Sequence, residues 1–178
     1  MRNISYLKVD ESIDKQRLVY KKDFFDKMDD YFYIFIFLAA LLASYNLLSL
    51  VDFKNSNDSF FAIIYLLFPI IAFYFLIRKI FEYRLKVIKT NNNQELNREK
   101  ILKYIEENGL EIYRNNQKCV IFNHDHDSFN HCATTIVLFK SKNVFYTTIR
   151  DKFKTNTPTI FTHIFIKNDL KKILTKSL

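Results

Sequence analysis

Two long uncharged stretches limit what this chain can fold into more than any other feature. Residues 31–51 and 59–77 contain no Asp, Glu, Lys or Arg, and charged residues bracket both stretches. A helix rises about 1.5 Å per residue, so each stretch is long enough to cross about 30 Å of hydrocarbon. Helices in soluble cores rarely stay apolar on every face for so long. The pattern predicts a two-span transmembrane helical hairpin over 31–77.

A cleaved secretory signal is the alternative interpretation of the first stretch. Residues 1–30 precede it, and they contain seven basic and seven acidic residues. Signal peptides begin with a short, net-positive segment, so we reject this alternative. Residues 1–30 are predicted to form a cytoplasmic N-terminal segment instead.

The basic residues beside the two stretches predict their orientation. Lys21, Lys22 and Lys27 precede the first stretch, and five Lys or Arg residues lie between positions 78 and 89. The loop between the stretches contains only Lys54. Because the excess of Lys and Arg lies on the cytoplasmic side of a membrane, both termini are expected in the cytoplasm. The lipid bilayer of an inner (plasma) membrane is therefore the first expected partner.

Polar residues in the outer half of the first stretch are candidates for contacts between hairpins. They are Ser44, Asn46 and Ser49. An amide in hydrocarbon needs a hydrogen-bond partner, which favours a homo-oligomer. The alternative is that Asn46 lies close enough to the interface to reach water. The absence of charge inside either stretch argues against a proton or ion transporter.

The remainder of the chain predicts a juxtamembrane helix and one small cytoplasmic domain. Residues 78–90 alternate apolar and basic side chains and are expected to continue the second helix at the lipid head groups. Residues 91–178 form the domain. Asn92 is expected to cap its first helix, and Gly109 is suited to end that helix.

Strands are expected after this helix. Alternating and β-branched residues predict two antiparallel hairpins, a fifth strand and a closing helix, at 110–114 with 119–122, 134–139 with 144–149, 159–166 and 168–174. Whether residues 4–9 add a strand to the same sheet stays open. The predicted fold class is a membrane α-helical hairpin plus a small α+β domain of helix, four to five antiparallel strands and helix.

The basic surplus lies after the second stretch. Residues 78–178 carry 19 basic and 10 acidic residues. Basic residues interleaved with aromatic ones form the candidate ligand site, namely Lys140, Lys142, Tyr146, Arg150, Lys152 and Lys154. Bases hold phosphates and aromatic rings stack on nucleobases, so a cyclic nucleotide is a candidate partner. The alternative is a solvated basic rim that faces the anionic lipids of the inner leaflet.

A histidine cluster provides the only candidate metal ligands. His124, His126 and His131 lie close together in the sequence, beside Asp127 and Cys132. Zinc binds to such side chains. The alternative is a solvated loop between two strand hairpins, because Asp, Asn, Ser and His are common in loops. The chain has no second ligand pair such as CxxC, so we expect no cofactor and keep zinc as the alternative.

No catalytic motif is present. One glycine in 178 residues excludes a Gly-rich nucleotide-binding loop, and neither an HExxH motif nor a nuclease carboxylate pattern occurs. Cys132 follows His131, but neighbouring residues of a strand point to opposite faces. An enzyme is therefore not expected.

The predicted architecture resembles the short two-helix membrane effectors of bacterial cyclic-nucleotide antiviral signalling. The resemblance covers the number of spans, their orientation and the size of the chain, and it includes no residue motif. It implies an oligomeric effector whose cytoplasmic domain senses a nucleotide or another anionic signal and alters membrane integrity. The alternative hypothesis is a membrane-anchored immunity or scaffold protein that binds a protein partner.

Overall fold

A computed structural model describes residues 6–22, 24–49, 56–124, 133–150 and 162–175. The chain divides into two compact units. The hairpin is Phe24–Phe81, and the sheet unit combines Met1–Asp23 with Glu82–Leu178. The sheet unit is therefore built from both sides of the hairpin in the sequence, whereas the sequence predicted a domain confined to residues 91–178.

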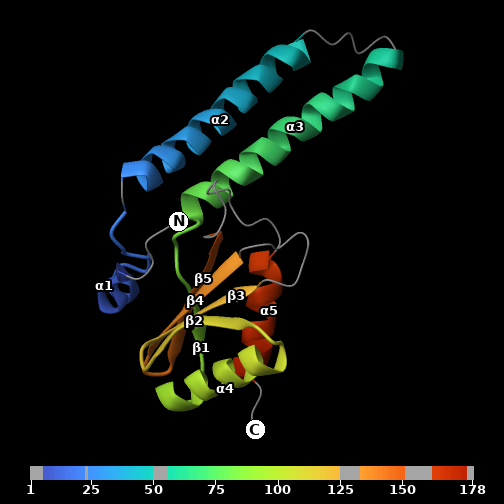
Figure 1. Ribbon diagram of the computed structural model, residues 1–178. Helices are drawn as coiled ribbons and strands as arrows, with labels where there is room; N and C mark the ends of the chain where they lie inside the picture. Colours follow the sequence, from blue (N-terminus) through green and yellow to red (C-terminus); the bar gives the residue numbers. More distant parts are fainter. Residues whose placement is uncertain (1–5, 23, 50–55, 125–132, 151–161, 176–178) are drawn as a thin grey trace. The chain divides into compact units, whose positions relative to one another are not determined.

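The hairpin consists of two antiparallel helices, α2 (Phe24–Ser49) and α3 (Ser56–Phe81), as Figure 1 shows. Asp26–Ser49 and Ile63–Phe81 are long and apolar enough to cross a membrane, judged by length and composition alone. The predicted helical hairpin is confirmed to this extent. Most of its described apolar side chains are exposed, and the rings of Phe37 and Phe75 stack between the two helices with centroids 5.7 Å apart.

The predicted juxtamembrane helix over 78–90 is wrong beyond Phe81. Helix α3 ends at Phe81, and strand β1 (Lys86–Lys89) follows it after a short connection. Val87 and Ile88 are β-branched and favour the extended backbone, and the strand pairs with β5 through four residues. The alternation of basic and apolar residues in this segment therefore has the period of a strand.

The sheet has five antiparallel strands in the order β1-β5-β4-β3-β2. The other strands are β2 (Glu111–Asn116), β3 (Cys119–His124), β4 (Ala133–Lys140) and β5 (Asn143–Arg150). These four confirm the two predicted strand hairpins. The fifth strand is β1, which comes from the segment directly after the hairpin.

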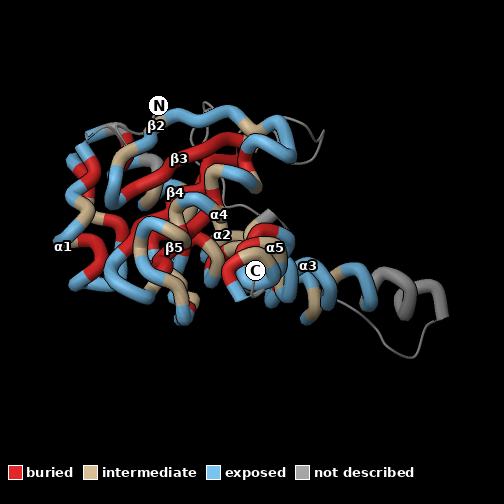
Figure 2. Tube along the Cα trace, turned by 90° about the horizontal axis from the view of Figure 1, so that it is seen from below, coloured by how far each residue is buried: buried red, intermediate tan, exposed pale blue. Residues whose placement is uncertain are grey.

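Helices α4 (Gln94–Glu107) and α5 (Thr162–Thr175) cover one face of the sheet. Figure 2 shows that β3 and β4 are buried over most of their lengths. The predicted strand over 159–166 is wrong from Thr162 onward, because α5 begins there; residues 159–161 lie outside the described part of the chain. Ile166, Leu170 and Leu174 are all buried, and their spacing of four residues is that of one helix face.

Both ends of α4 have clear causes. The side chain of Asn93 accepts a hydrogen bond from the amide of Leu96, 2.8 Å away, so Asn93 caps the helix and not Asn92. The Asn92 amide instead donates to the carbonyl of Leu174. Gly109 follows the helix with φ of 60°, the left-handed conformation that was predicted for it.

The N-terminal segment covers the opposite face of the sheet. Helix α1 (Val9–Asp14) lies there, followed by an extended segment. Leu7, Ile13 and Leu18 are buried against side chains from β3, β4 and β5, namely Cys119, Ile121, Ile136, Leu138, Phe145 and Ile149. The sheet unit thus has three layers, and the segment before the hairpin supplies one of them.

Candidate functional site

The segment that leads into the hairpin and the segment that follows it are joined by backbone hydrogen bonds. Arg17 and Arg84 form an isolated antiparallel bridge. The amide of Leu18 donates to the carbonyl of Tyr83, 2.8 Å away, and the amide of Leu85 donates to the carbonyl of Gln16 at 3.0 Å. Arg17 and Arg84 are thus a non-hydrogen-bonded pair, the type in which side chains approach most closely.

Aromatic and basic side chains reinforce this junction. The rings of Tyr20 and Tyr83 lie with centroids 6.0 Å apart. The Lys22 ammonium is 3.8 Å from the centroid of Tyr83, which is a favourable cation–π distance. The hydroxyl of Thr147 on β5 donates to the carbonyl of Glu82 at 2.9 Å. Within the sheet unit, β5, the segment that begins at Glu82 and the N-terminal segment are therefore fixed to one another.

Four exposed lysines gather at the other end of the sheet, and we call them the lysine end: Lys89, Lys118, Lys140 and Lys142. Lys89 and Lys140 both pair with Asn143, one from each side. The carbonyl of Lys142 accepts from the amide of Thr90, and that of Lys118 accepts from Phe139. Strand register and turn contacts therefore bring together lysines that are far apart in the sequence.

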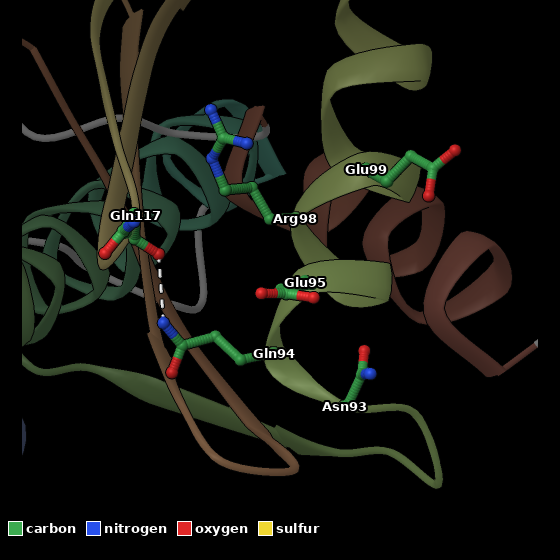
Figure 3. A pocket seen from close by; sticks show the side chains of 6 residues that line it. All are labelled: Asn93, Gln94, Glu95, Arg98, Glu99 and Gln117. Carbon is green, nitrogen blue, oxygen red and sulfur yellow. Dashed lines mark hydrogen bonds between the residues drawn. The ribbon is translucent and has the colours of Figure 1, made fainter.

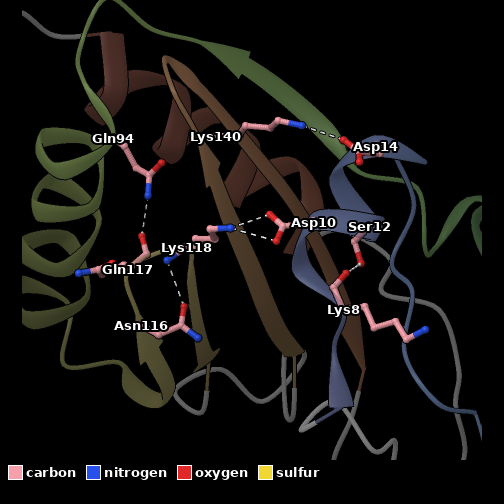
Figure 4. Close-up of polar contacts among 9 residues, drawn as sticks. All are labelled: Lys8, Asp10, Ser12, Asp14, Gln94, Asn116, Gln117, Lys118 and Lys140. Carbon is pink, nitrogen blue, oxygen red and sulfur yellow. Dashed lines mark hydrogen bonds and ion pairs between the residues drawn. The ribbon is translucent and has the colours of Figure 1, made fainter.

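Helix α1 presents its carboxylates to the lysine end (Figure 4). The ammonium of Lys118 donates to both carboxylate oxygens of Asp10, at 2.9 and 3.0 Å. The ammonium of Lys140 donates to Asp14 at 2.7 Å. This hydrogen bond raises the pKa of Lys140, and the charge of Asp10 adds to the effect. The two ion pairs thus form one group of four charges.

The structure separates the residues predicted to bind a ligand. Lys140 and Lys142 lie at the lysine end, whereas Arg150 ends β5 and pairs with Ala133 at the start of β4. Seven strand residues of about 3.3 Å each place Arg150 roughly 23 Å away. Tyr146 is buried beneath the helices, which raises its pKa to about 12 and leaves no ring face for a nucleobase. Lys152 and Lys154 lie outside the described residues.

Of the three predicted metal ligands, the structure describes His124 alone, and His126 and His131 lie outside the described residues. His124 ends β3, and its Nε2 atom lies 3.1 Å from the hydroxyl of Thr135. Within the described ranges, no group of three or more His, Cys, Asp or Glu side chains is placed to hold a metal ion.

The three predicted oligomer contacts occupy different positions on α2. Ser44 is buried, faces α3 and donates to the carbonyl of Ala40 at 2.7 Å. It is therefore used within one hairpin and is not available to a second copy. Asn46 and Ser49 are exposed, and the Ser49 hydroxyl donates to the Asn46 carbonyl. Both remain candidates for a contact between hairpins.

A buried ion pair joins the two helices of the hairpin. The Lys79 ammonium lies 2.7 Å from a carboxylate oxygen of Asp30, and the two side chains are 1% and 16% exposed. The same ammonium lies 5.4 Å from the centroid of the Tyr33 ring. Sequence analysis missed this contact because both charges fall just outside the uncharged stretches.

A polar hollow lies at the start of α4 (Figure 3). Its volume is about 720 Å³, and it is lined by Asn93, Gln94, Glu95, Arg98, Glu99 and Gln117. Arg98 donates to the side chain of Asn115 at 2.6 Å, and Gln94 donates to the carbonyl of Gln117 at 3.0 Å. The two glutamates outnumber the arginine, whose guanidinium already binds Asn115. The hollow therefore does not attract an anion.

Sequence analysis missed the contribution of α1 to the lysine end. Three of the six residues of α1 are acidic and none is basic, a charge pattern that marks it as the complement of a basic surface. Lys118 and Lys89 were also missed, because their neighbours in space come from other strands. No protein-family model, curated protein or solved structure matches this chain.

Proposed function

We propose that this chain is an oligomeric, two-span inner-membrane effector whose sheet unit senses an anionic signal on the cytoplasmic side. The signal alters the hairpin and thereby membrane integrity. The observation that carries the proposal is the assembly of one sheet unit from the segments on both sides of the hairpin. A signal that shifts the sheet acts on both connections to the hairpin at once.

The same observation supports the proposed topology. Leu18 and Tyr83 are joined by a backbone hydrogen bond, so the segments before and after the hairpin lie on one side of any membrane that the hairpin enters. The excess of Lys and Arg in these segments favours the cytoplasmic side. The apolar exterior of the hairpin supports insertion, because exposed apolar surface of this extent is unfavourable in water.

The oligomeric part of the proposal is supported by the surface of α2. One hairpin cannot enclose a pore, and the exposed Asn46 and Ser49 offer cross-helix hydrogen bonds of about 0.6–1 kcal/mol each. The anionic signal is supported by the basic surplus of the sheet unit and by its lysine end.

The test is to lock the two connections to the hairpin together. In a Cys132→Ser background, Arg17→Cys and Arg84→Cys should form a disulfide, because the non-hydrogen-bonded pair has the required separation. The full-length chain is placed in dye-loaded liposomes and exposed to a panel of cyclic nucleotides and other phosphorylated compounds. We expect dye release from the reduced protein and none from the oxidised protein.

The control places two cysteines at Glu99 and Glu106, both exposed on α4. They lie about 10 Å apart, too far for a disulfide, so oxidation of exposed thiols alone should leave dye release unchanged. Equal release from the reduced and oxidised forms of the junction variant contradicts the proposed coupling. Absence of binding and of dye release across the whole panel contradicts the effector function and favours the immunity or scaffold alternative.

A further inference from the structure

We propose that the lysine end is an anion-binding site that α1 occupies with its own carboxylates, and that a ligand bearing several phosphates displaces them. This inference rests on the proposed function and names the site and the ligand class. The ligand chemistry follows from the four lysines alone, since ammonium groups bind phosphate as point charges.

The charges at this end of the sheet are one-sided. Residues 86–89, 116–119 and 140–143 contain five lysines, the four of the lysine end and Lys86, and no acid. The acids that balance them come from α1, where Asp10 and Asp14 are spaced four residues apart and reach Lys118 and Lys140. Without α1 the lysine end would be an uncompensated cluster of positive charge.

The contacts that a ligand must replace are weak individually. All four partners are more than half exposed, and ion pairs between such side chains contribute little to stability. Apolar side chains hold α1 to the sheet independently of the ion pairs, since Ile13 is almost fully buried. A polyphosphate therefore competes only with two carboxylates and does not have to unfold the N-terminal segment.

Displacement has a direct route to the hairpin. Helix α1 is followed by Gln16, with φ of 49°, and then by Arg17 and Leu18, which are bonded to the segment that leaves α3. Releasing the carboxylates of α1 from the lysine end removes two contacts that restrain this segment, so the chain that leads into α2 becomes less restrained while Ile13 stays buried. The same ligand would bridge β1 and β4, because Lys89 and Lys140 flank Asn143.

The test uses inorganic tripolyphosphate and the full-length chain in neutral detergent at low salt, with calorimetry as the measurement. Asp10→Asn with Asp14→Asn should tighten binding about tenfold, because the internal competitor is removed. Lys118→Gln with Lys140→Gln should weaken it at least tenfold. Lys89→Gln with Lys142→Gln, which leaves the ion pairs to α1 intact, should weaken it several-fold.

The matched control is Glu99→Gln with Glu106→Gln, which changes the net charge as the Asp10 and Asp14 pair does but lies on α4. It should change the affinity less than threefold, the size of a general charge effect. Hydrogen exchange of the α1 amides should also become faster when wild-type protein is saturated with tripolyphosphate.

Equal affinities in the aspartate and glutamate variants, or an unchanged affinity in Lys118→Gln with Lys140→Gln, overturn the proposed site. The proposed function is separated by the liposome assay. Dye release that survives Lys118→Gln with Lys140→Gln supports the function and refutes this site. Binding with the predicted pattern but no dye release under any ligand supports the site and refutes the effector function.

Discussion

The hairpin contains an ion pair that is buried, whereas the sheet unit contains an ion pair of the same kind that is exposed to water. Lys79 and Asp30 in the hairpin, and Lys140 and Asp14 in the sheet unit, form ion pairs of the same length, 2.7 Å. The Lys79 side chain is 1% exposed, whereas that of Lys140 is 54% exposed. Desolvation makes an unpaired buried charge unfavourable, whereas water screens an exposed one. Loss of one partner should therefore destabilise the hairpin much more than the sheet unit, although the two distances are equal.

Apolar side chains show the opposite contrast, because many are exposed in the hairpin and most are buried in the sheet unit. The hairpin exposes residues such as Phe35 and Leu42, while the sheet unit buries Ile121, Ile136 and Ile149 completely. This contrast is the one expected if the hairpin lies in a membrane as proposed, because hydrocarbon accepts apolar surface and water does not. Stability in the sheet unit should therefore come from apolar burial, and the hairpin should depend on the buried ion pair between Asp30 and Lys79.

Removing apolar contacts of the N-terminal segment should have the largest effect. Ile13→Ala with Leu18→Ala removes two buried side chains from one layer of the sheet unit. Each substitution should cost about 2–5 kcal/mol, enough together to unfold the unit at ambient temperature. Urea unfolding in detergent measures this. Ile164→Ala, at an exposed position on α5, is the control and should change little.

Breaking the buried ion pair should come next. Lys79→Ala leaves Asp30 without its partner and should destabilise the hairpin by about 3–5 kcal/mol. The exchange Asp30→Lys with Lys79→Asp should recover part of the loss, and Asp30→Asn with Lys79→Met should recover most of it. Thermal unfolding in detergent is the measurement. If Lys79→Ala lowered the melting temperature no more than the double variants do, the ion pair would have to be solvated.

Alkaline pH should weaken the sheet unit to a lesser degree. Burial raises the pKa of Tyr104 and Tyr146 to about 12, and the Asp169 carboxylate contributes to the first. The unfolded chain releases these protons near pH 10 and the folded chain near pH 12, so the stability that the two tyrosines contribute is complete below pH 10 and is lost between the two values. Tyr104→Phe with Tyr146→Phe should flatten this loss in urea unfolding at pH 9, 10 and 11.

The exposed ion pairs should matter least for stability. Lys140→Ala and Lys118→Ala each remove a contact to α1 that water already screens. Their melting temperatures should match that of the wild type within error. A clear drop in either variant would contradict the contrast with Lys79 and assign the lysine end a structural role.

The sequence predicted the parts of the fold that depend on local patterns. The strands that contain Ile121, Ile136 and Phe145 lie where they were predicted, and Gly109 ends α4 as its backbone freedom suggests. Strand β1 was missed because Lys86–Lys89 closely follows the apolar helix α3 in the sequence and was assigned to a continuation of it, whereas it pairs with β5. The β-branched residues before Leu170 similarly suggested a strand, but packing of Ile166 on the sheet selects a helix.

The candidate site was less predictable, because it depends on contacts distant in sequence. Lys140 and Asp14 are 126 positions apart, and Lys118 and Asp10 are 108 apart. No local pattern relates such residues. The basic residues from Lys140 to Arg150 were grouped because they are close in sequence. A strand of this length, however, places its two ends at opposite ends of the sheet.

The insertion of the hairpin within the sheet unit also constrains how the protein is made. During synthesis the N-terminal segment emerges first, yet the strands that it covers follow the hairpin in the sequence. If the hairpin spans a membrane as proposed, Leu7, Ile13 and Leu18 meet these partners only after both helices have been inserted. In a chain with only one span inserted, the two parts of the sheet unit would lie on opposite sides of the bilayer. Such a chain could not fold, so folding of the sheet unit would act as proofreading of membrane insertion.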